Sequence, residues 1–200
     1  MWWQFGLQVL PVLLLGGIVL VITSSFEPPG SVPILMVILA ATSILLFIAL
    51  LTFRERPDWN LALLLGFSAS LGAVIPLLGP GSHAMLGYAP LRLVLPCLVF
   101  AALAGTWLGS GVGEIGAILW LVSWVYMLGW AVLIFLQLEA VFHLTWSVVG
   151  LVLFTGIAAV WFGNIEGHFA QRSSVSVAID LYLVCLNLYL AALILQSVQV

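Results

Sequence analysis

The chain has 200 residues, of which 64% are hydrophobic and only 6% carry a charge, and its formal net charge is −3. A water-soluble domain carries about 25% charged residues, so this composition excludes a soluble globular protein and indicates that lipid is the main solvent. The sequence contains no lysine, which also argues against a basic surface that would bind nucleic acid.

The few charged residues divide the chain into charge-free stretches, each close to or above the length of about 20 residues that crosses a bilayer as a helix. Guided by these stretches, we predict spans at residues 4–22, 31–53, 60–78, 91–110, 115–138, 146–164 and 175–197. The alternation of apolar and polar residues that is typical of transmembrane strands does not occur. The sequence therefore predicts an all-α integral membrane protein, with residues 1–200 forming a single transmembrane domain, a seven-transmembrane-helix bundle.

The N-terminal stretch contains no basic residue, so we interpret it as a retained first helix and not as a signal peptide. Arg54, Arg56 and Arg172 fall in predicted loops on the same side of the membrane as the N-terminus, whereas Arg92 falls on the other side. Because arginines of short loops favour the cytoplasmic side, we expect the N-terminus to be cytoplasmic. The expected location is the bacterial inner membrane, with the lipid bilayer as the first partner.

The fourth predicted span has a small residue at every fourth position, namely Ala101, Gly105, Gly109 and Gly113. Such a small-xxx-small stripe lets the backbones of two helices approach closely. Two interpretations stay open, packing within the molecule and a dimer face that meets a second copy.

The last two predicted spans contain the polar residues with the clearest functional interest. Asp180 lies about one and a half turns into the last span, and Asn187 follows on the same helix face. Asn164 and Glu166 end the sixth span, and an antiparallel hairpin around residues 171–174 would bring Glu166 and Asp180 to a similar depth. Two neighbouring carboxylates share a proton or bind a cation. The alternative is two interfacial acids solvated by headgroups and water.

Several classes of membrane enzyme lack their required residues in this sequence. A retinal protein needs a Schiff-base lysine, and a membrane zinc protease needs a His-Glu-x-x-His motif or a relative of it. The three histidines stand apart without the spacing of metal ligands. We therefore expect no enzyme, no cofactor and no metal beyond a transient cation at Asp180.

A family resemblance lies in the last two spans. The segment 178–190, AIDLYLVCLNLYL, resembles the last helix of the Bax inhibitor-1 (transmembrane BAX inhibitor motif) family, which reads as alanine, then Leu-Tyr-Leu-Asp, two apolar residues and Asn-Leu-Phe-Leu. The segment 147–156, SVVGLVLFTG, is similar to the Ser-Val-x-Gly-x-x-x-Phe-Ser stretch of the preceding helix. An arginine-bearing turn after the second span, with Gly72 and Pro76 in the third, also fits the family layout.

The resemblance implies a seven-helix bundle with a calcium or proton-coupled cation leak. It also implies a buried pair of aspartates, one in each of the last two helices, that senses pH. This sequence has Val184 at the last-helix position and a non-acidic residue, at or near Trp161, at the other. Asp180 lies one turn before Val184 on the same face and would take its place at a different depth, with Glu166, Asn164 or Arg172 as its partner.

Two functional hypotheses follow. The first is a pH-sensitive path for Ca²⁺ or H⁺, with Asp180 as the titrating gate, Glu166 as a second carboxylate and Asn187 as a neutral ligand. Arg54, Arg56 and Arg172 supply its counter-charges. The second is a non-conducting accessory or scaffold subunit that packs against a membrane partner or another copy of the chain, as the glycine stripe and the low polar content suggest.

Overall fold

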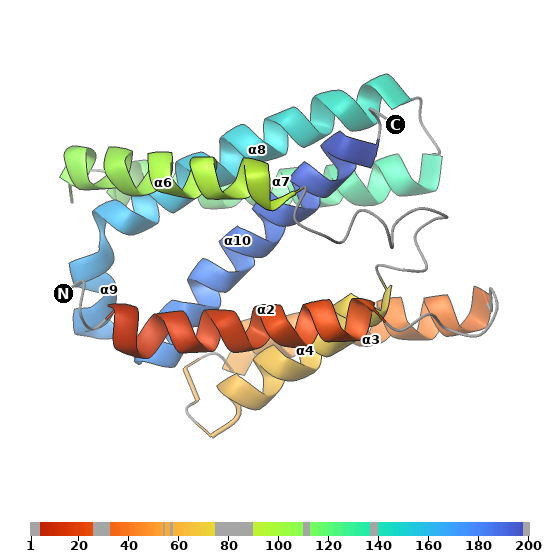
Figure 1. Ribbon diagram of the computed structural model, residues 1–200, viewed down its shortest axis with the longest axis horizontal. Coiled ribbons are helices and arrows are strands. Elements are labelled where there is room, and N and C mark those ends of the chain that lie inside the picture. Colours follow the sequence, from red (N-terminus) through yellow and green to blue (C-terminus); the bar gives the residue numbers. More distant parts are fainter. Residues whose placement is uncertain are drawn as a thin grey trace. The chain divides into compact units, whose positions relative to one another are not determined.

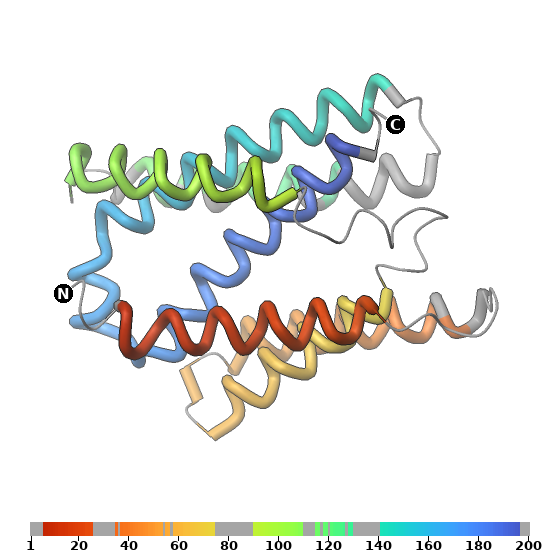
Figure 2. The backbone as a smooth tube through the Cα atoms, viewed as in Figure 1, coloured from red at the N-terminus to blue at the C-terminus, as the bar shows by residue number. Residues whose placement is uncertain are grey.

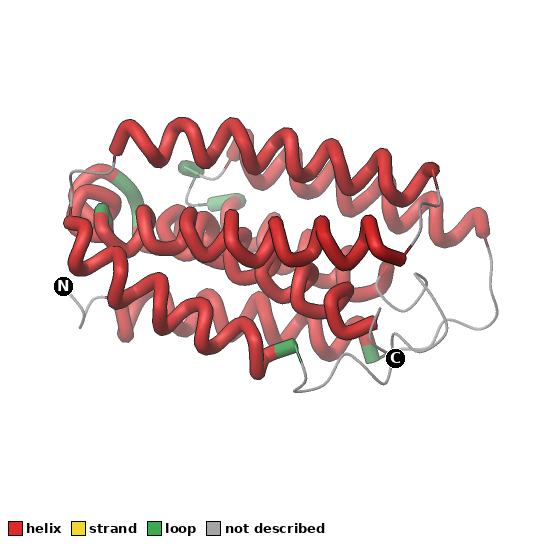
Figure 3. The backbone as a smooth tube through the Cα atoms, turned by 90° about the horizontal axis from the view of Figure 1, so that it is seen from above, coloured by secondary structure: helices red, strands yellow, loops and turns green. Residues whose placement is uncertain are grey.

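The computed structural model describes residues 5–25, 33–53, 55–56, 58–74, 90–109, 113–136 and 140–197. The regular structure in these ranges is helical and includes no strand (Figures 1 and 3). The helices are η1 (Phe5–Val9, a short π-helix), α2 (Leu10–Ser24), α3 (Pro33–Phe53), α4 (Asn60–Val74), α6 (Leu91–Leu108), α7 (Gly113–Leu136), α8 (Ala140–Gly163), α9 (Ile165–Gln171) and α10 (Ser174–Ser197). The predicted all-helical class is confirmed.

Among the described helices, four are long and apolar enough to cross a bilayer, over Gly6–Ser24, Leu91–Leu108, Val141–Gly163 and Ser174–Gln196. Two shorter apolar helices cover Val37–Phe53 and Asn60–Val74. Helices are the natural outcome here because hydrocarbon offers no partner to backbone N–H and C=O groups, which a helix pairs internally. A multi-pass membrane protein is therefore confirmed, and the exact number of seven spans stays a prediction.

The connection between the last two spans differs from the hairpin turn that the sequence predicts. The backbone N–H of Asn164 bonds to the carbonyls of Val160 and Trp161 at 3.1 and 3.2 Å, which closes α8. The chain then forms the seven-residue helix α9 before α10 begins. A further difference is that α8 begins at Ala140 and not at 146, because residues 140–145 contain no proline or glycine that would stop a helix.

The chain divides into two compact units. Unit 1 comprises Met1–Leu86 and His168–Tyr182, and unit 2 comprises Gly87–Gly167 and Leu183–Val200. Helix α10 therefore contributes its first residues to unit 1 and its later residues to unit 2.

In unit 1, α2 and α3 both pack against α4, and Figure 2 shows α2 in red beside α4 in yellow. A Cβ atom at Gly72 of α4 would overlap Thr23 Oγ1 and the carbonyl oxygen of Leu20, so only a glycine allows this approach to α2. The hydroxyls of Ser43 and Ser70, which are 2.7 Å apart and buried, join α3 to α4.

Tyr182 attaches the first part of α10 to this group of helices. Ser68 Oγ of α4 donates a hydrogen bond to Tyr182 Oη at 2.8 Å. Tyr182 Oη donates in turn to the carbonyl oxygen of Gly16 of α2 at 3.5 Å. The ring lies so close to Gly16 that a Cβ there would be 2.9 Å from it. These contacts fix the residues before Tyr182 against α2 and α4.

In unit 2, α6 and α7 pack against α8. Gly105 of α6 lies directly on the α8 backbone, where a Cβ would overlap the carbonyl oxygen of Ala159. Tyr126 of α7 stacks on Trp146 with ring centroids 5.3 Å apart and meets Phe154 edge-on at 5.4 Å. Aromatic pairs in these two geometries are the favourable ones.

The predicted stripe of small residues is divided by the end of α6. Ala101 and Gly105 are buried in α6, whereas Gly109 caps this helix with a φ of 64° and Gly113 begins α7. A positive φ cannot continue a right-handed helix, and glycine adopts it without steric cost. The close helix contact of the stripe is therefore made by Gly105 on α8, within unit 2.

Candidate functional site

The start of α10 is organised by the residues directly before it. Ser173 is the N-cap, and its Oγ accepts the backbone N–H of Ser176 at 3.2 Å, which satisfies one of the unpaired donors of the first turn. The backbone N–H of Arg172 bonds to the carbonyl of His168 at 3.1 Å and so closes α9. Arg172 thus stands in a two-residue connection between two helices.

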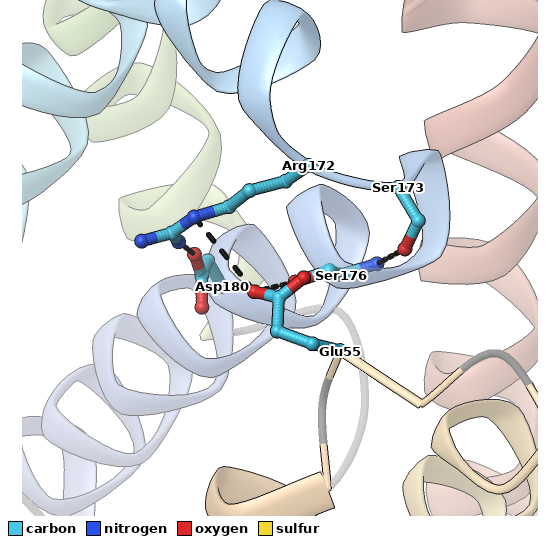
Figure 4. Close-up of polar contacts among 5 residues, drawn as sticks. All are labelled: Glu55, Arg172, Ser173, Ser176 and Asp180. Atoms are coloured by element: carbon cyan, nitrogen blue, oxygen red, sulfur yellow. Dashed lines mark hydrogen bonds and ion pairs between the residues drawn. The ribbon is translucent and has the colours of Figure 1, made fainter.

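The Arg172 side chain contacts two carboxylates (Figure 4). Its Nη1 lies 2.6 Å from Asp180 Oδ2, and its Nε lies 3.8 Å from Glu55 Oε1. The exposed fractions of the side chains are 30% for Arg172, 18% for Asp180 and 52% for Glu55. One guanidinium therefore bridges a largely buried carboxylate on α10 and a half-exposed one in the turn after α3.

Two serines of α10 bind segments that are distant in sequence. Ser176, which is fully buried, donates its hydroxyl to Glu55 Oε1 at 2.9 Å. Ser174 donates to Gln8 Oε1 of η1. The starts of η1 and α10 and the turn after α3 therefore lie together in unit 1. We call Glu55, Arg172, Ser173, Ser176 and Asp180 the charged cluster.

His168, half-buried one helical turn before Arg172, responds to the charges of this cluster. Burial lowers the pKa of His168 below its ordinary value of 6.5, and the Arg172 guanidinium lowers it further, while the Asp180 carboxylate acts in the opposite direction. Burial and a like charge both disfavour the imidazolium. Burial and the Arg172 guanidinium thus favour the neutral form of His168.

Comparison with protein families gives a match over nearly the whole chain. The model of the family described as inhibitor of apoptosis-promoting Bax1 matches residues 1–198. The chain belongs to the Bax inhibitor-1 family. The comparison with curated proteins and the comparison with solved structures each returned no match. The resemblance noted in the last two spans is thus confirmed, and the chain is a Bax-inhibitor-1-like multi-pass membrane protein.

Two positions of this chain depart from the Bax inhibitor-1 pattern. Val184 and Trp161, which stand where the resemblance implies the aspartate pair, are 8% and 6% exposed. Among the residues that the structure describes, no group of three or more His, Cys, Asp or Glu side chains could hold a metal ion. The acidic residue of α10 is Asp180, and of the three partners considered for it, Arg172 is the one that pairs with it.

The other candidates for the cation path lie in unit 2. Glu166 is exposed in the first turn of α9. Asn164 donates its side-chain amide to the carbonyl of Val160 at 3.2 Å, and Asn187 donates likewise to Leu183 at 2.7 Å. Both amides therefore bond to the backbone of the preceding helical turn.

Two further arginines were expected to act as counter-charges. Arg56 is exposed in the turn before α4, and Arg54 lies outside the described residues. Sequence reasoning did not select Glu55, which lies between these two arginines. The sequence did offer a sign of the contact between Glu55 and Arg172, because this turn and Arg172 were both expected on the N-terminal side of the membrane.

Proposed function

We propose that this Bax inhibitor-1 family member provides a pH-sensitive path for a cation, Ca²⁺ or H⁺, and that the Arg172–Asp180 ion pair controls it. The observation that carries the proposal is the distance of 2.6 Å between Arg172 Nη1 and Asp180 Oδ2 at the start of an apolar helix. A carboxylate inside a membrane span is costly and marks an ion or proton path by default. The guanidinium occupies the place that a permeating cation would take.

The ion pair explains how acid would act on such a path. While Arg172 neutralises Asp180, a cation finds no unbalanced negative charge there. A proton on Asp180 removes the attraction, and the guanidinium can then leave the carboxylate. Asn187, seven residues further along the same face of α10, is our candidate for the next ligand. The proposal assigns no catalysis to the chain.

Flux into liposomes tests the proposal. Purified protein is reconstituted with a Ca²⁺-sensitive or a pH-sensitive dye, and uptake is followed from neutral to mildly acid pH. We expect Asp180→Asn to abolish the pH dependence, because the titrating charge is gone. Arg172→Gln should raise flux at neutral pH several-fold, because the blocking cation is gone. Arg92→Gln is the control, since it removes an exposed arginine to which the proposed path gives no role.

Two outcomes would contradict the proposal. Unchanged pH dependence in Asp180→Asn would exclude Asp180 as the gate. A wild-type chain without flux at any pH would exclude the path itself and favour the second hypothesis, an accessory subunit, which copurification of a stoichiometric membrane partner or a second copy in mild detergent would support.

A further inference from the structure

Arg172 stands between two acceptors that differ in distance and in environment. The Asp180 carboxylate is 18% exposed and makes the short contact of 2.6 Å, whereas the Glu55 carboxylate is 52% exposed and lies 3.8 Å from Nε. The shorter contact in the drier environment is the stronger one. Arg172 therefore makes a short contact with one carboxylate and a longer contact with a second, more exposed one (Figure 4).

The second acceptor is fixed in place. A glutamate in an exposed turn samples many rotamers, and holding it in one of them costs conformational entropy. Here the buried Ser176 hydroxyl binds Glu55 Oε1 at 2.9 Å, and Ser176 itself is anchored by its backbone bond to the Ser173 cap. The oxygen that Ser176 binds is the same Oε1 that faces Arg172 Nε.

We propose that Glu55 is the alternative acceptor that receives the Arg172 guanidinium when Asp180 loses its charge to a proton or a cation. A partly buried guanidinium left without a carboxylate is unfavourable, so a second acceptor at hand makes its departure from Asp180 easier. Glu55 acts through Arg172 and is a positioning residue. The purpose of this exchange rests on the proposed function, but the exchange itself can be measured without any flux.

In the described part of the chain, the charged or titratable groups that act on Arg172 include Asp180, Glu55 and His168. The two carboxylates and the guanidinium together carry a net charge of −1. Protonation of His168 would add a second positive charge one turn from Arg172 and repel it. Replacing Asp180 by asparagine mimics the loss of its charge at a constant pH, so the test below does not depend on His168.

Thermal unfolding of Glu55→Gln in three backgrounds tests the exchange. The loss of Tm on Glu55→Gln is measured in the wild type, in Asp180→Asn and in Arg172→Gln, all in the same detergent. We expect the loss to be at least twice as large in Asp180→Asn as in the wild type, because Glu55 is then the main acceptor. In Arg172→Gln the loss of Tm should be smaller than in the wild type, because Glu55 no longer faces a guanidinium. Equal losses in the wild type and Asp180→Asn would overturn the proposal.

A second measurement uses the intact Asp180 chain. The chain has four arginines and no lysine, so the Arg172 Nε–H resonance can be assigned in nanodiscs by comparison with Arg172→Gln. We expect this resonance to stay protected from solvent exchange at acid pH in the wild type and in Glu55→Asp, and to be lost in Glu55→Gln. Loss in all three, or protection in all three, would overturn the role of Glu55.

The flux assay separates this inference from the proposed function. If flux is pH-dependent but both measurements above show no exchange, Glu55 is not the acceptor and the proposed function stands. If exchange is measured and flux is absent, the ion-pair exchange is real and the proposed function is wrong. If both hold, Glu55→Gln should need a more acid pH for half-maximal flux, and Glu55→Asp should restore the wild-type profile.

Discussion

Arg172 illustrates why the kind of cation matters in the charged cluster. A guanidinium presents N–H groups in several directions of one plane, so Nη1 and Nε can face different carboxylates at the same time. A lysine ammonium is a compact point charge and could not reproduce both contacts. The half-exposed Glu55 contact contributes only about 0–1 kcal/mol to stability, as surface ion pairs do, so the stabilising part of the bridge is the contact with Asp180.

The pKa of His168 reports the charge of this cluster. Since the pKa of His168 in the folded chain lies below 6.5, the unfolded chain binds this proton more readily than the folded one. The contribution of His168 to folding stability is therefore fully present above about pH 6.5. It decreases as the pH falls from there towards the pKa of the folded chain, and below that pKa it is lost. We expect an NMR titration of the histidines in nanodiscs to show this lowered pKa, with His168→Gln giving the assignment.

The two charged neighbours of His168 supply matched variants for the same titration. Arg172→Gln should raise the pKa of His168, because a like charge is removed. Asp180→Asn should lower it further, because the carboxylate that favours the imidazolium is gone. Shifts in the reverse directions would show that the cluster is arranged differently around the imidazole.

The helices of unit 1 come together through small residues and hydroxyls. Lipid tails are as apolar as leucine, so helix association in a membrane depends on close packing and on interhelical hydrogen bonds. Gly72 supplies the close approach of α4 to α2, and Ser43 with Ser70 supplies a buried bond between α3 and α4. The arrangement of these helices positions the turn that contains Glu55.

A pair of glycine substitutions tests this close packing. Gly72→Ala should destabilise the protein by about 1–3 kcal/mol, the usual cost of overpacking, because its Cβ would overlap Thr23 Oγ1 and the Leu20 carbonyl. Gly17→Ala is the control, since no atom lies within 4 Å of its added Cβ, and alanine favours a helix over glycine by about 1 kcal/mol. Thermal unfolding in detergent measures both. A Gly72→Ala protein as stable as Gly17→Ala would contradict the α2–α4 contact.

At the scale of the whole molecule, the number of membrane crossings decides which loops share a side. In unit 1 the bonds from Ser174 to Gln8 and from Ser176 to Glu55 place η1, the turn after α3 and the start of α10 at one end. The number of seven crossings stays a prediction. Family membership supports the membrane class but does not give the orientation.

Labelling of single cysteines in a cysteine-free background tests the predicted topology. Arg56→Cys, Arg92→Cys and Glu166→Cys each place a thiol at an exposed position outside the apolar interiors of the helices. With seven crossings, a membrane-impermeant reagent should label positions 56 and 166 from the same side, expected to be the cytoplasmic one, and position 92 from the other. Labelling of all three from one side would exclude this topology.

The membrane class, the helical structure and most helix boundaries follow from the amino-acid sequence alone. The reason is that hydrocarbon accepts only backbones that are paired within their own segment, so apolar length and the positions of charges predict the helices. Thus α3 ends at Phe53, directly before the charged turn, and α10 begins at Ser174. The side chains of the last two spans also indicated the family.

Which charges meet depends on the tertiary fold. The sequence offered Glu166, Asn164 and Arg172 as partners of Asp180, and the fold of α9 and α10 brings Arg172 to it. Glu55 is 121 residues from Ser176, and such a contact depends on how α3 and α4 pack and not on any local pattern. The end of α6 likewise follows from the positive φ of Gly109, and the packing of Gly105 on α8 follows from a tertiary contact. The four-residue spacing of small residues does not predict either of them.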